Sequence, residues 1–129
     1  HIMTPQFSTW SHSAHKTITD CNACHVPHDN IFRKYYFKAS DGMRHSAIFT
    51  LRKEPHSIYI REAGKNVVQE NCLRCHSGLF SDGPGMPDQA LSGRRERQCL
   101  DCHRYTPHDR VNSISSTPGA ITPTLKDKL

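Results

Sequence analysis

Three short cysteine motifs constrain this chain more than any other feature of its sequence. They are Cys21-Asn22-Ala23-Cys24-His25, Cys72-Leu73-Arg74-Cys75-His76 and Cys99-Leu100-Asp101-Cys102-His103, and they use all six cysteines. Each has the C-x-x-C-H pattern of c-type haem attachment. One backbone turn presents both sulfurs to the same side, where they can form thioethers with one porphyrin while the histidine binds the iron. The motifs therefore predict three covalently attached haem c groups with proximal ligands His25, His76 and His103.

Two other uses of paired cysteines fit the sequence less well. A zinc site combines two C-x-x-C pairs, so three pairs leave one over, and zinc does not require a histidine directly after each pair. A redox-active disulfide of the thioredoxin type lies in a β-α-β context, and the sequence shows no such alternation. We therefore interpret the cysteines as haem anchors.

The chain has little apolar material for a conventional core. Its 129 residues are 35% hydrophobic with a mean hydropathy of −0.69, and its 7 glycines and 8 prolines favour turns over long regular elements. Porphyrins offer large apolar surfaces on which short helices and loops can pack. We expect a single small multihaem cytochrome c domain over residues 1–129, mostly α with extensive irregular loops, organised around its covalently bound haems.

Local patterns predict a short helix before the first haem motif and a longer one through the second. The first covers residues 17–25, with Thr19 or Asp20 as its cap. The second carries apolar and cysteine residues at helical spacing and ends near Gly78. Both place a haem motif at the end of a helix.

A third helix is predicted between these two. It begins at Asp29 or Asn30, runs for about three turns with apolar residues at helical spacing, and stops at Gly42. Residues 79–98 are rich in Gly, Pro and Arg and are expected to form a surface loop. Residues 111–129 are rich in Ser, Thr and Pro and are expected to be either mobile or ordered only against another surface, and we favour the second.

The basic charge of the chain raises the question of nucleic acid binding. The formal net charge is +5 and the pI is near 9.0. Haem propionates are negative, so several haems nearly cancel this excess and require arginine and lysine as partners. The runs RKYYFK and GRRER are therefore interpreted as propionate or protein contacts, and no nucleic acid partner is expected.

The sixth coordination position of each iron decides what the haem can do. A second histidine gives a low-spin electron carrier, whereas an open position can meet a substrate. Two or three further histidines are expected to be distal ligands, and spacing alone does not select among them. The candidates outside the motifs are His1, His12, His15, His28, His45, His56 and His108.

Two long stretches carry a resemblance to a known family. They are CNACHVPHDNIFRKYYFKASDGMRHSAIFTLRKEPHSIYIREAGKNVVQENCLRCH and CLDCHRYTPHDRVNSISSTP. Over nearly its whole length the chain resembles the NapC/NrfH family of membrane-anchored tetrahaem cytochrome c quinol dehydrogenases, most closely the members that serve cytochrome c nitrite reductase. The segments KYYFKASDG, VVQENCLRCH and VNSISSTP are more specific than the haem motifs, which many cytochromes share.

The resemblance gives a meaning to the first residues. Family members have an N-terminal transmembrane helix followed by a first haem motif of the form C-x-x-C-H-x-M, and His1-Ile2-Met3 matches the end of that motif. The resemblance implies an anchor helix and a fourth haem in the intact protein. Residues 1–16 are then the remainder of the haem 1 region, with His1 a remnant of the motif and Met3 a ligand of the haem 1 iron. An alternative is that the three residues are a cloning scar.

The resemblance also assigns a quinol site. The family's lysine and aspartate match Lys34 and Asp41 in RKYYFKASDG. A carboxylate can accept protons that quinol oxidation releases, and a lysine can stabilise an anionic form of the quinol.

Distal ligands are implied in the same way. His15 matches the ligand of haem 3, bound at Cys72 and Cys75, and His108 matches the ligand of haem 2, bound at Cys21 and Cys24. Haem 4, bound at Cys99 and Cys102, takes its distal ligand in the family from a lysine of the partner subunit. The resemblance thus makes residues 17–110 the haem-binding core and residues 111–129 a partner-docking tail. His28, a rival ligand, and His45 have no assigned counterpart.

The function implied is an electron relay at the periplasmic side of the bacterial inner membrane. Menaquinol gives electrons to haem 1, and haems 2, 3 and 4 pass them to a multihaem reductase, pentahaem cytochrome c nitrite reductase. Nitrite reduction to ammonia is expected in that partner, because its catalytic haem uses C-x-x-C-K and all three motifs here end in histidine. Two alternatives are a soluble multihaem shuttle without a quinol site and a quinol dehydrogenase serving another periplasmic oxidoreductase.

Overall fold

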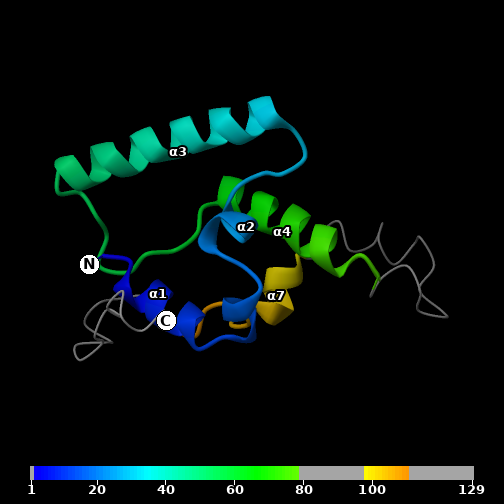
Figure 1. Cartoon of the computed structure of the whole chain (residues 1–129). Helices are drawn as coiled ribbons and strands as arrows, with labels where there is room; N and C mark the ends of the chain where they lie inside the picture. Colours follow the sequence, from blue (N-terminus) through cyan, green and yellow to red (C-terminus); the bar gives the residue numbers. More distant parts are fainter. Residues whose placement is uncertain (1, 79–97, 111–129) are drawn as a thin grey trace.

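A computed structural model of the chain describes residues 2–78 and 98–110, and the helical elements in these ranges are short except for two (Figure 1). In chain order they are α1 (Thr4–Ser11), the 3-10 helix η1 (Ala14–Thr17), α2 (Cys21–His25), α3 (Ile31–Thr50), α4 (Glu62–His76) and α7 (Cys99–His103). The described residues contain no β-strand. The expectation of a mostly α domain with extensive irregular segments is confirmed.

The apolar core of the described residues is very small. Its buried hydrophobic side chains are Val26, Val67 and Val68. Val26 directly follows α2 and the other two lie on α4, so the core sits between these helices. By contrast, Phe32 and Tyr36 on α3 are 82% and 77% exposed. Such a small core is what we expect of a chain whose apolar surfaces pack on bound porphyrins.

The start of α2 follows from one side chain. Asp20 caps the helix, and its carboxylate accepts a hydrogen bond from the Ala23 backbone N–H at 2.7 Å. The predicted Asp20 cap is confirmed, but a continuous helix from residue 17 is wrong. The reason is that residues 14–17 form the separate turn η1, and an N-cap residue has extended backbone that begins a new helix.

The long helix α3 begins as predicted and ends later. The Asn30 side chain accepts hydrogen bonds from the N–H groups of Phe32 and Arg33 at 2.8 and 3.3 Å. The predicted stop at Gly42 is wrong, since α3 continues to Thr50. A glycine inside a helix costs only about 1 kcal/mol relative to alanine, which does not end a helix when its neighbours favour one.

One half-buried seam of α3 faces the rest of the molecule. None of its residues is fully buried. The intermediate positions recur every three or four residues, as one face of a helix requires, and they are Lys34, Phe37, Asp41, Arg44 and Ile48. Figure 1 shows α3 along one side of the molecule, apart from the cluster of α1, α2, α4 and α7.

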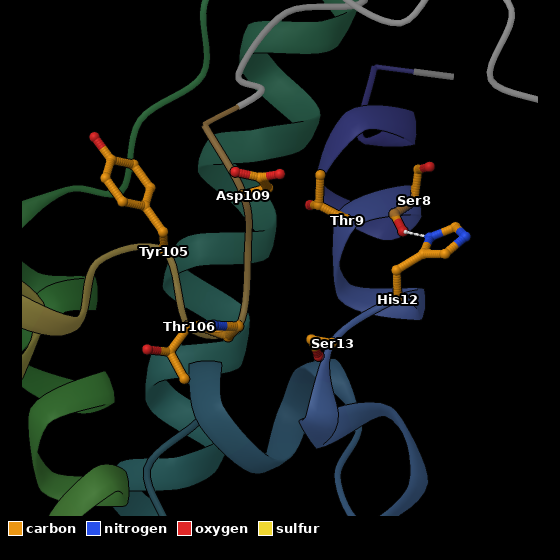
Figure 2. A pocket seen from close by; sticks show the side chains of 8 residues that line it. Ser8, Thr9, His12, Ser13, Tyr105, Thr106 and Asp109 are labelled. Carbon is orange, nitrogen blue, oxygen red and sulfur yellow. Dashed lines mark hydrogen bonds between the residues drawn. The ribbon is translucent and has the colours of Figure 1, made fainter.

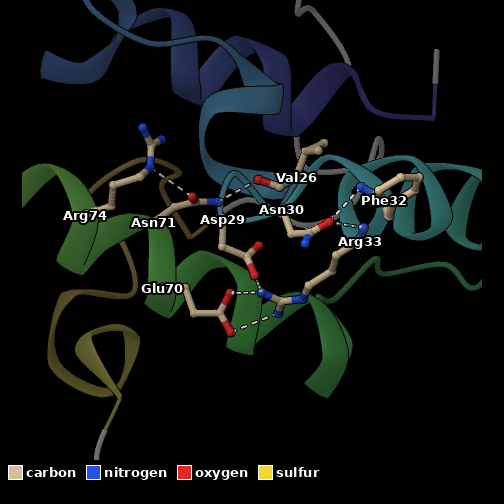
Figure 3. A network of polar contacts seen from close by, with 8 residues as sticks. All are labelled: Val26, Asp29, Asn30, Phe32, Arg33, Glu70, Asn71 and Arg74. Carbon is tan, nitrogen blue, oxygen red and sulfur yellow. Dashed lines mark hydrogen bonds and ion pairs between the residues drawn. The ribbon is translucent and has the colours of Figure 1, made fainter.

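Two ion pairs connect α3 to the segment that contains α4. Arg33 donates from both guanidinium nitrogens to the Glu70 carboxylate at 2.7 and 2.9 Å, as Figure 3 shows. Arg61, the N-cap of α4, donates to Asp41 at 2.7 Å. These contacts hold a helix that has almost no apolar packing of its own.

The remaining helices agree with the sequence predictions in part. The helix α1 was not predicted, although Pro5 in its first turn is a typical start signal. The helix α4 ends at His76 with Ser77 as its C-cap, so the predicted end near Gly78 is confirmed. Residues 79–97 of the predicted surface loop lie outside the described residues. The predicted tail over 111–129 also lies outside them. Every helix in the described ranges is too short or too polar to cross a bilayer.

Replacement of Gly42 by alanine is expected to stabilise the protein by about 0.5–1 kcal/mol, because no atom lies within 4 Å of the added Cβ and the helix interior favours alanine. Denaturant unfolding measures the change. Gly64→Ala is the matched comparison within α4, where the added Cβ meets Ile60 Cγ1 at 2.9 Å and the gain should be smaller or absent. A lower stability of Gly42→Ala would contradict a continuous α3.

Candidate haem sites

Each haem motif forms a helical turn that ends on its histidine. His25 is the last residue of α2, His76 of α4 and His103 of α7. The two cysteines of each motif lie three apart on the same helix, and therefore on one side of it. All six cysteines are free of disulfides, and no cluster of three or more metal-binding side chains occurs in the described ranges. The spacing of the cysteines and the histidine at the end of each helical turn is that of a haem attachment turn.

A buried amide joins the first two motifs. Asn71, which directly precedes Cys72, is 4% exposed, and its Nδ2 donates to the carbonyl oxygens of Cys24 and Val26, both at 2.9 Å. Its Oδ1 accepts from Arg74 Nε at 3.2 Å (Figure 3). Since the last carbonyl groups of a helix have no partner within it, these bonds complete the end of α2.

Arg74 strengthens the same junction. It lies inside the second motif, one turn after Asn71, and its Nη2 donates to the carbonyl of Ala23 at 3.2 Å. A cation beside the C-terminal carbonyls of a helix is favourable because that end carries partial negative charge. Asn71 and Arg74 together fix how the first and second haem turns sit against each other.

The third motif is attached to α4 through other side chains. Gln69 Oε1 accepts a hydrogen bond from the Cys99 backbone N–H at 2.7 Å, and Gln98 Nε2 donates to Asn66 Oδ1 at 2.9 Å. The helix α7 itself starts with a capping box between Gln98 and Asp101. Thus α4 carries one haem turn and holds the other two.

The sulfur atoms are close enough to affect one another's protonation. Burial, followed by the effects of Cys99 and Cys24, raises the pKa of Cys72 to about 11. Burial also raises the pKa of Cys24, followed by the effect of Cys75. The three attachment turns therefore bring their thiols into one neighbourhood.

One distant histidine lies opposite the first motif. The rings of His25 and His108 have centroids 6.2 Å apart. His108 Nδ1 is 2.9 Å from the backbone carbonyl of Gln6, and because a carbonyl only accepts, Nδ1 carries the proton and Nε2 is left with its lone pair. Such a bond fixes the tautomer and orientation of a metal-binding imidazole.

The electrostatics of this pair favour the neutral form that binds metal. Burial lowers the pKa of His108. Desolvation also lowers the pKa of His25, and the nearby His108 lowers it further. Both shifts favour the neutral imidazole, which can donate a nitrogen lone pair.

A second histidine pair lies at the second motif. The rings of His15 and His76 have centroids 6.2 Å apart and are nearly perpendicular, at 77°. His15 lies in η1, whose cap Ser13 accepts from the His15 backbone N–H at 3.3 Å. Its Nδ1 is buried without a hydrogen-bond partner among the described residues. A buried polar atom without a partner indicates an absent group.

Both pairs fit an iron between two imidazoles. An imidazole nitrogen lies about 2 Å from a bound metal and its ring centre roughly 1 Å further out, so opposed imidazoles have centres about 6 Å apart. The two separations of 6.2 Å agree with this value. The cysteine turns, the opposed rings and the small apolar core therefore fit haem c.

Other predicted site residues lie elsewhere. Met3 is 54% exposed at the N-cap of α1, and His1 lies outside the described residues. The histidine ring pairs found among the described residues do not include His103. His28 Nε2 is 3.1 Å from the Asn22 carbonyl.

His12 lines a cavity of about 380 Å³ between α1 and the segment after α7. Figure 2 shows Ser8, Thr9 and His12 on one wall and Tyr105, Thr106 and Asp109 on the other. The His12 Nδ1 lies 2.8 Å from the Ser8 carbonyl. No sequence prediction pointed to this cavity.

The predicted quinol residues share the inner seam of α3. Lys34 and Asp41 lie seven residues apart, two helical turns along one face. Asp41 Oδ1 accepts from Arg61 Nη2 at 2.7 Å, and Oδ2 lies 3.5 Å from His45 Nε2. Sequence reasoning missed both partners. The i, i+4 spacing of Asp41 and His45 was the available signal, and it was lost by ending the helix at Gly42.

Comparison with known proteins gives relatives that match nearly all of the chain. The cytochrome c-type protein NrfH of Wolinella succinogenes is 42% identical over 123 residues, covering 92% of this chain and 70% of the relative. The cytochrome c nitrite reductase subunit NrfH of Nitratidesulfovibrio vulgaris (strain Hildenborough) is 35% identical over 116 residues, covering 90% of this chain and 67% of the relative. No protein-family model matches.

A solved structure resembles the fold. It is the crystal structure of the cytochrome c nitrite reductase NrfHA complex bound to the HQNO inhibitor, with a TM-score of 0.72 and 31% identity, covering 96% of this chain and 77% of that chain. The fold and the haem turns define a small multihaem c-type cytochrome. The chain belongs to the NrfH family, which confirms the NapC/NrfH assignment.

Replacement of Asn71 by alanine is expected to destabilise the protein by about 1–3 kcal/mol, because the buried carbonyls of Cys24 and Val26 lose their donor. Equilibrium unfolding in guanidinium chloride measures the loss. Asn66→Ala is the matched control on the exposed side of α4, with an expected effect below about 1 kcal/mol. Equal effects of the two substitutions would contradict the role of Asn71.

Proposed function

We propose that this chain is the electron-transfer subunit that oxidises menaquinol and delivers the electrons to a periplasmic multihaem reductase. The reductase is the large subunit of pentahaem cytochrome c nitrite reductase, in which nitrite is reduced to ammonia. The observation that carries the proposal is structural similarity to a known complex. The fold of one chain of the NrfHA complex matches 96% of this chain. That complex was solved with the HQNO inhibitor bound, which supports a quinol-binding site in this chain.

Three haem c groups would be held by the three cysteine pairs and by His25, His76 and His103. His108 would complete the first site and His15 the second, a proposal that the two ring separations of 6.2 Å support. A fourth haem would be held in the region of His1 and Met3. Bound haem c supplies reversible one-electron transfer.

The protein's own residues keep these ligands in place. The Gln6 carbonyl orients the His108 imidazole, and Ser13 fixes the backbone of His15. The Asn71 and Arg74 contacts hold two of the turns at one distance from each other. A fixed arrangement suits electron transfer, because preorganised sites need little rearrangement as charge moves.

Quinol oxidation requires groups that accept protons and stabilise anionic charge. We assign these tasks to Asp41 and Lys34 on the inner seam of α3. Arg61 holds one carboxylate oxygen of Asp41 at 2.7 Å, which leaves the other oxygen for proton exchange. Lys34 adds positive charge two turns away on the same face.

The proposal includes a location and a docking face. The chain would act at the periplasmic side of the bacterial inner membrane, held by an N-terminal helix as in the family it resembles. The turn α7, with His103 exposed, would face the reductase, and a partner lysine would complete that haem.

Separate replacement of His15 and His108 by alanine is expected to convert one haem each from low-spin to high-spin iron, because each loses its second imidazole. Optical and electron paramagnetic resonance spectra of the oxidised protein measure this change. His12→Ala is the matched control, since its ring contacts the Ser8 carbonyl and no motif histidine. Unchanged spectra for His15→Ala or His108→Ala would contradict the assigned ligand.

Asp41→Asn is expected to lower menaquinol oxidation by about 10²-fold in the full-length protein with its reductase, because a proton acceptor is lost. Lys34→Ala should lower the rate in the same direction. Turnover with a menaquinol analogue and nitrite measures both. Lys38→Ala, an exposed lysine one turn from Lys34, is the control and should retain the rate. Unchanged turnover in Asp41→Asn and Lys34→Ala would favour a shuttle without a quinol site.

A further inference from the structure

We propose that His45 is a further proton-transfer residue of quinol oxidation, which accepts protons from Asp41 and releases them to water. The inference rests on the proposed quinol site at Asp41. It adds a proton exit from that site, formed by one side chain on the next turn of α3.

The continuity of α3 creates the contact. Since the helix does not stop at Gly42, His45 lies four residues beyond Asp41, on the adjacent turn of the same face. His45 Nε2 is 3.5 Å from Asp41 Oδ2. This separation is slightly longer than a direct hydrogen bond, and a small rotation of the imidazole closes it.

The two oxygens of Asp41 have different partners. Oδ1 accepts from Arg61 Nη2 at 2.7 Å. Arginine does not give up its proton in proteins, so this oxygen is held by a permanent cation. Oδ2 faces His45, whose imidazole can both accept and release a proton. The carboxylate is therefore oriented with its exchangeable oxygen toward the histidine.

Solvent exposure increases from Asp41 to His45. The Asp41 side chain is 27% exposed and the His45 side chain is 66% exposed. Asp41 lies on the inner seam of α3, and His45 lies beside that seam on the solvent side. A proton that reaches Asp41 can thus pass to His45 and from there to bulk water.

The chemistry balances at each transfer. Each quinol O–H bond that breaks gives its proton to Asp41 Oδ2, and bound haem c would supply the acceptor for the one electron that accompanies that proton. His45 Nε2 then takes the proton from Oδ2, and the Nδ1 proton is released to water. An imidazole is a stronger base than a carboxylate, so this direction is favourable.

The charged residues around the transfer are one aspartate and two arginines. Asp41 faces the imidazole from α3, Arg61 faces the same carboxylate from the start of α4, and Arg44 is the neighbouring residue on the seam.

His45→Gln tests the inference in the full-length protein with its reductase. We expect turnover with a menaquinol analogue and nitrite to fall about tenfold at neutral pH with KM for the quinol unchanged, since proton transfer and not binding is impaired. Added imidazole buffer should restore part of the rate in His45→Gln and leave the unsubstituted protein unchanged. His56→Gln, an exposed histidine outside the helices, is the control and should retain the rate.

Two results separate this inference from the proposed function. If Asp41→Asn lowers turnover but His45→Gln does not, or if imidazole gives no rescue, the proton exit is wrong and the quinol site stands. If Asp41→Asn leaves turnover unchanged, the proposed quinol site itself is wrong. Circular dichroism and the haem absorption spectrum of His45→Gln should match those of the unsubstituted protein, which excludes loss of fold or haem as the cause.

Discussion

The buried amide of Asn71 is the contact on which the arrangement of the haem turns depends. It donates to two carbonyls at the end of α2 from a position next to Cys72, and it is 4% exposed. Few buried apolar side chains are available to fix this arrangement, because the described core consists of Val26, Val67 and Val68. A buried polar group without partners costs more than a made hydrogen bond contributes, so this contact defines one arrangement of the two turns.

A chain with so few apolar contacts needs another source of order. Opposed histidines at two motifs are separated by the distance that one metal between them requires, and they come from segments far apart in sequence. Iron at these sites would link η1 to α4 and the segment after α7 to α2. The helix α1 adds a further link, because its Gln6 carbonyl orients His108. The protein is thereby organised around its ligands, and α3 stands outside with a separate polar site.

Local features of the structure were predictable and distant ones were not. The cysteine spacing predicts the haem turns, and the Asp20 cap follows from residues within one turn. Asn71 joins residues 45 and 47 positions away, and His108 bonds a carbonyl 102 positions away, contacts that no local pattern encodes. Gly42 misled the prediction because a glycine signal is weak inside a helix supported by ion pairs at both its start and its middle. The role of His45 was hidden by the same error.

The central claim is that covalently bound haems complete the interior and the conducting path of this molecule. Intact mass spectrometry of the mature protein, combined with acid–acetone extraction, tests it most directly. We predict a mass that exceeds the polypeptide by one haem for each of the three motifs in this chain, plus one for a fourth motif if the intact protein carries it, with the colour remaining in the protein after extraction. A mass equal to the polypeptide alone, or colour that passes into the acetone, would contradict it.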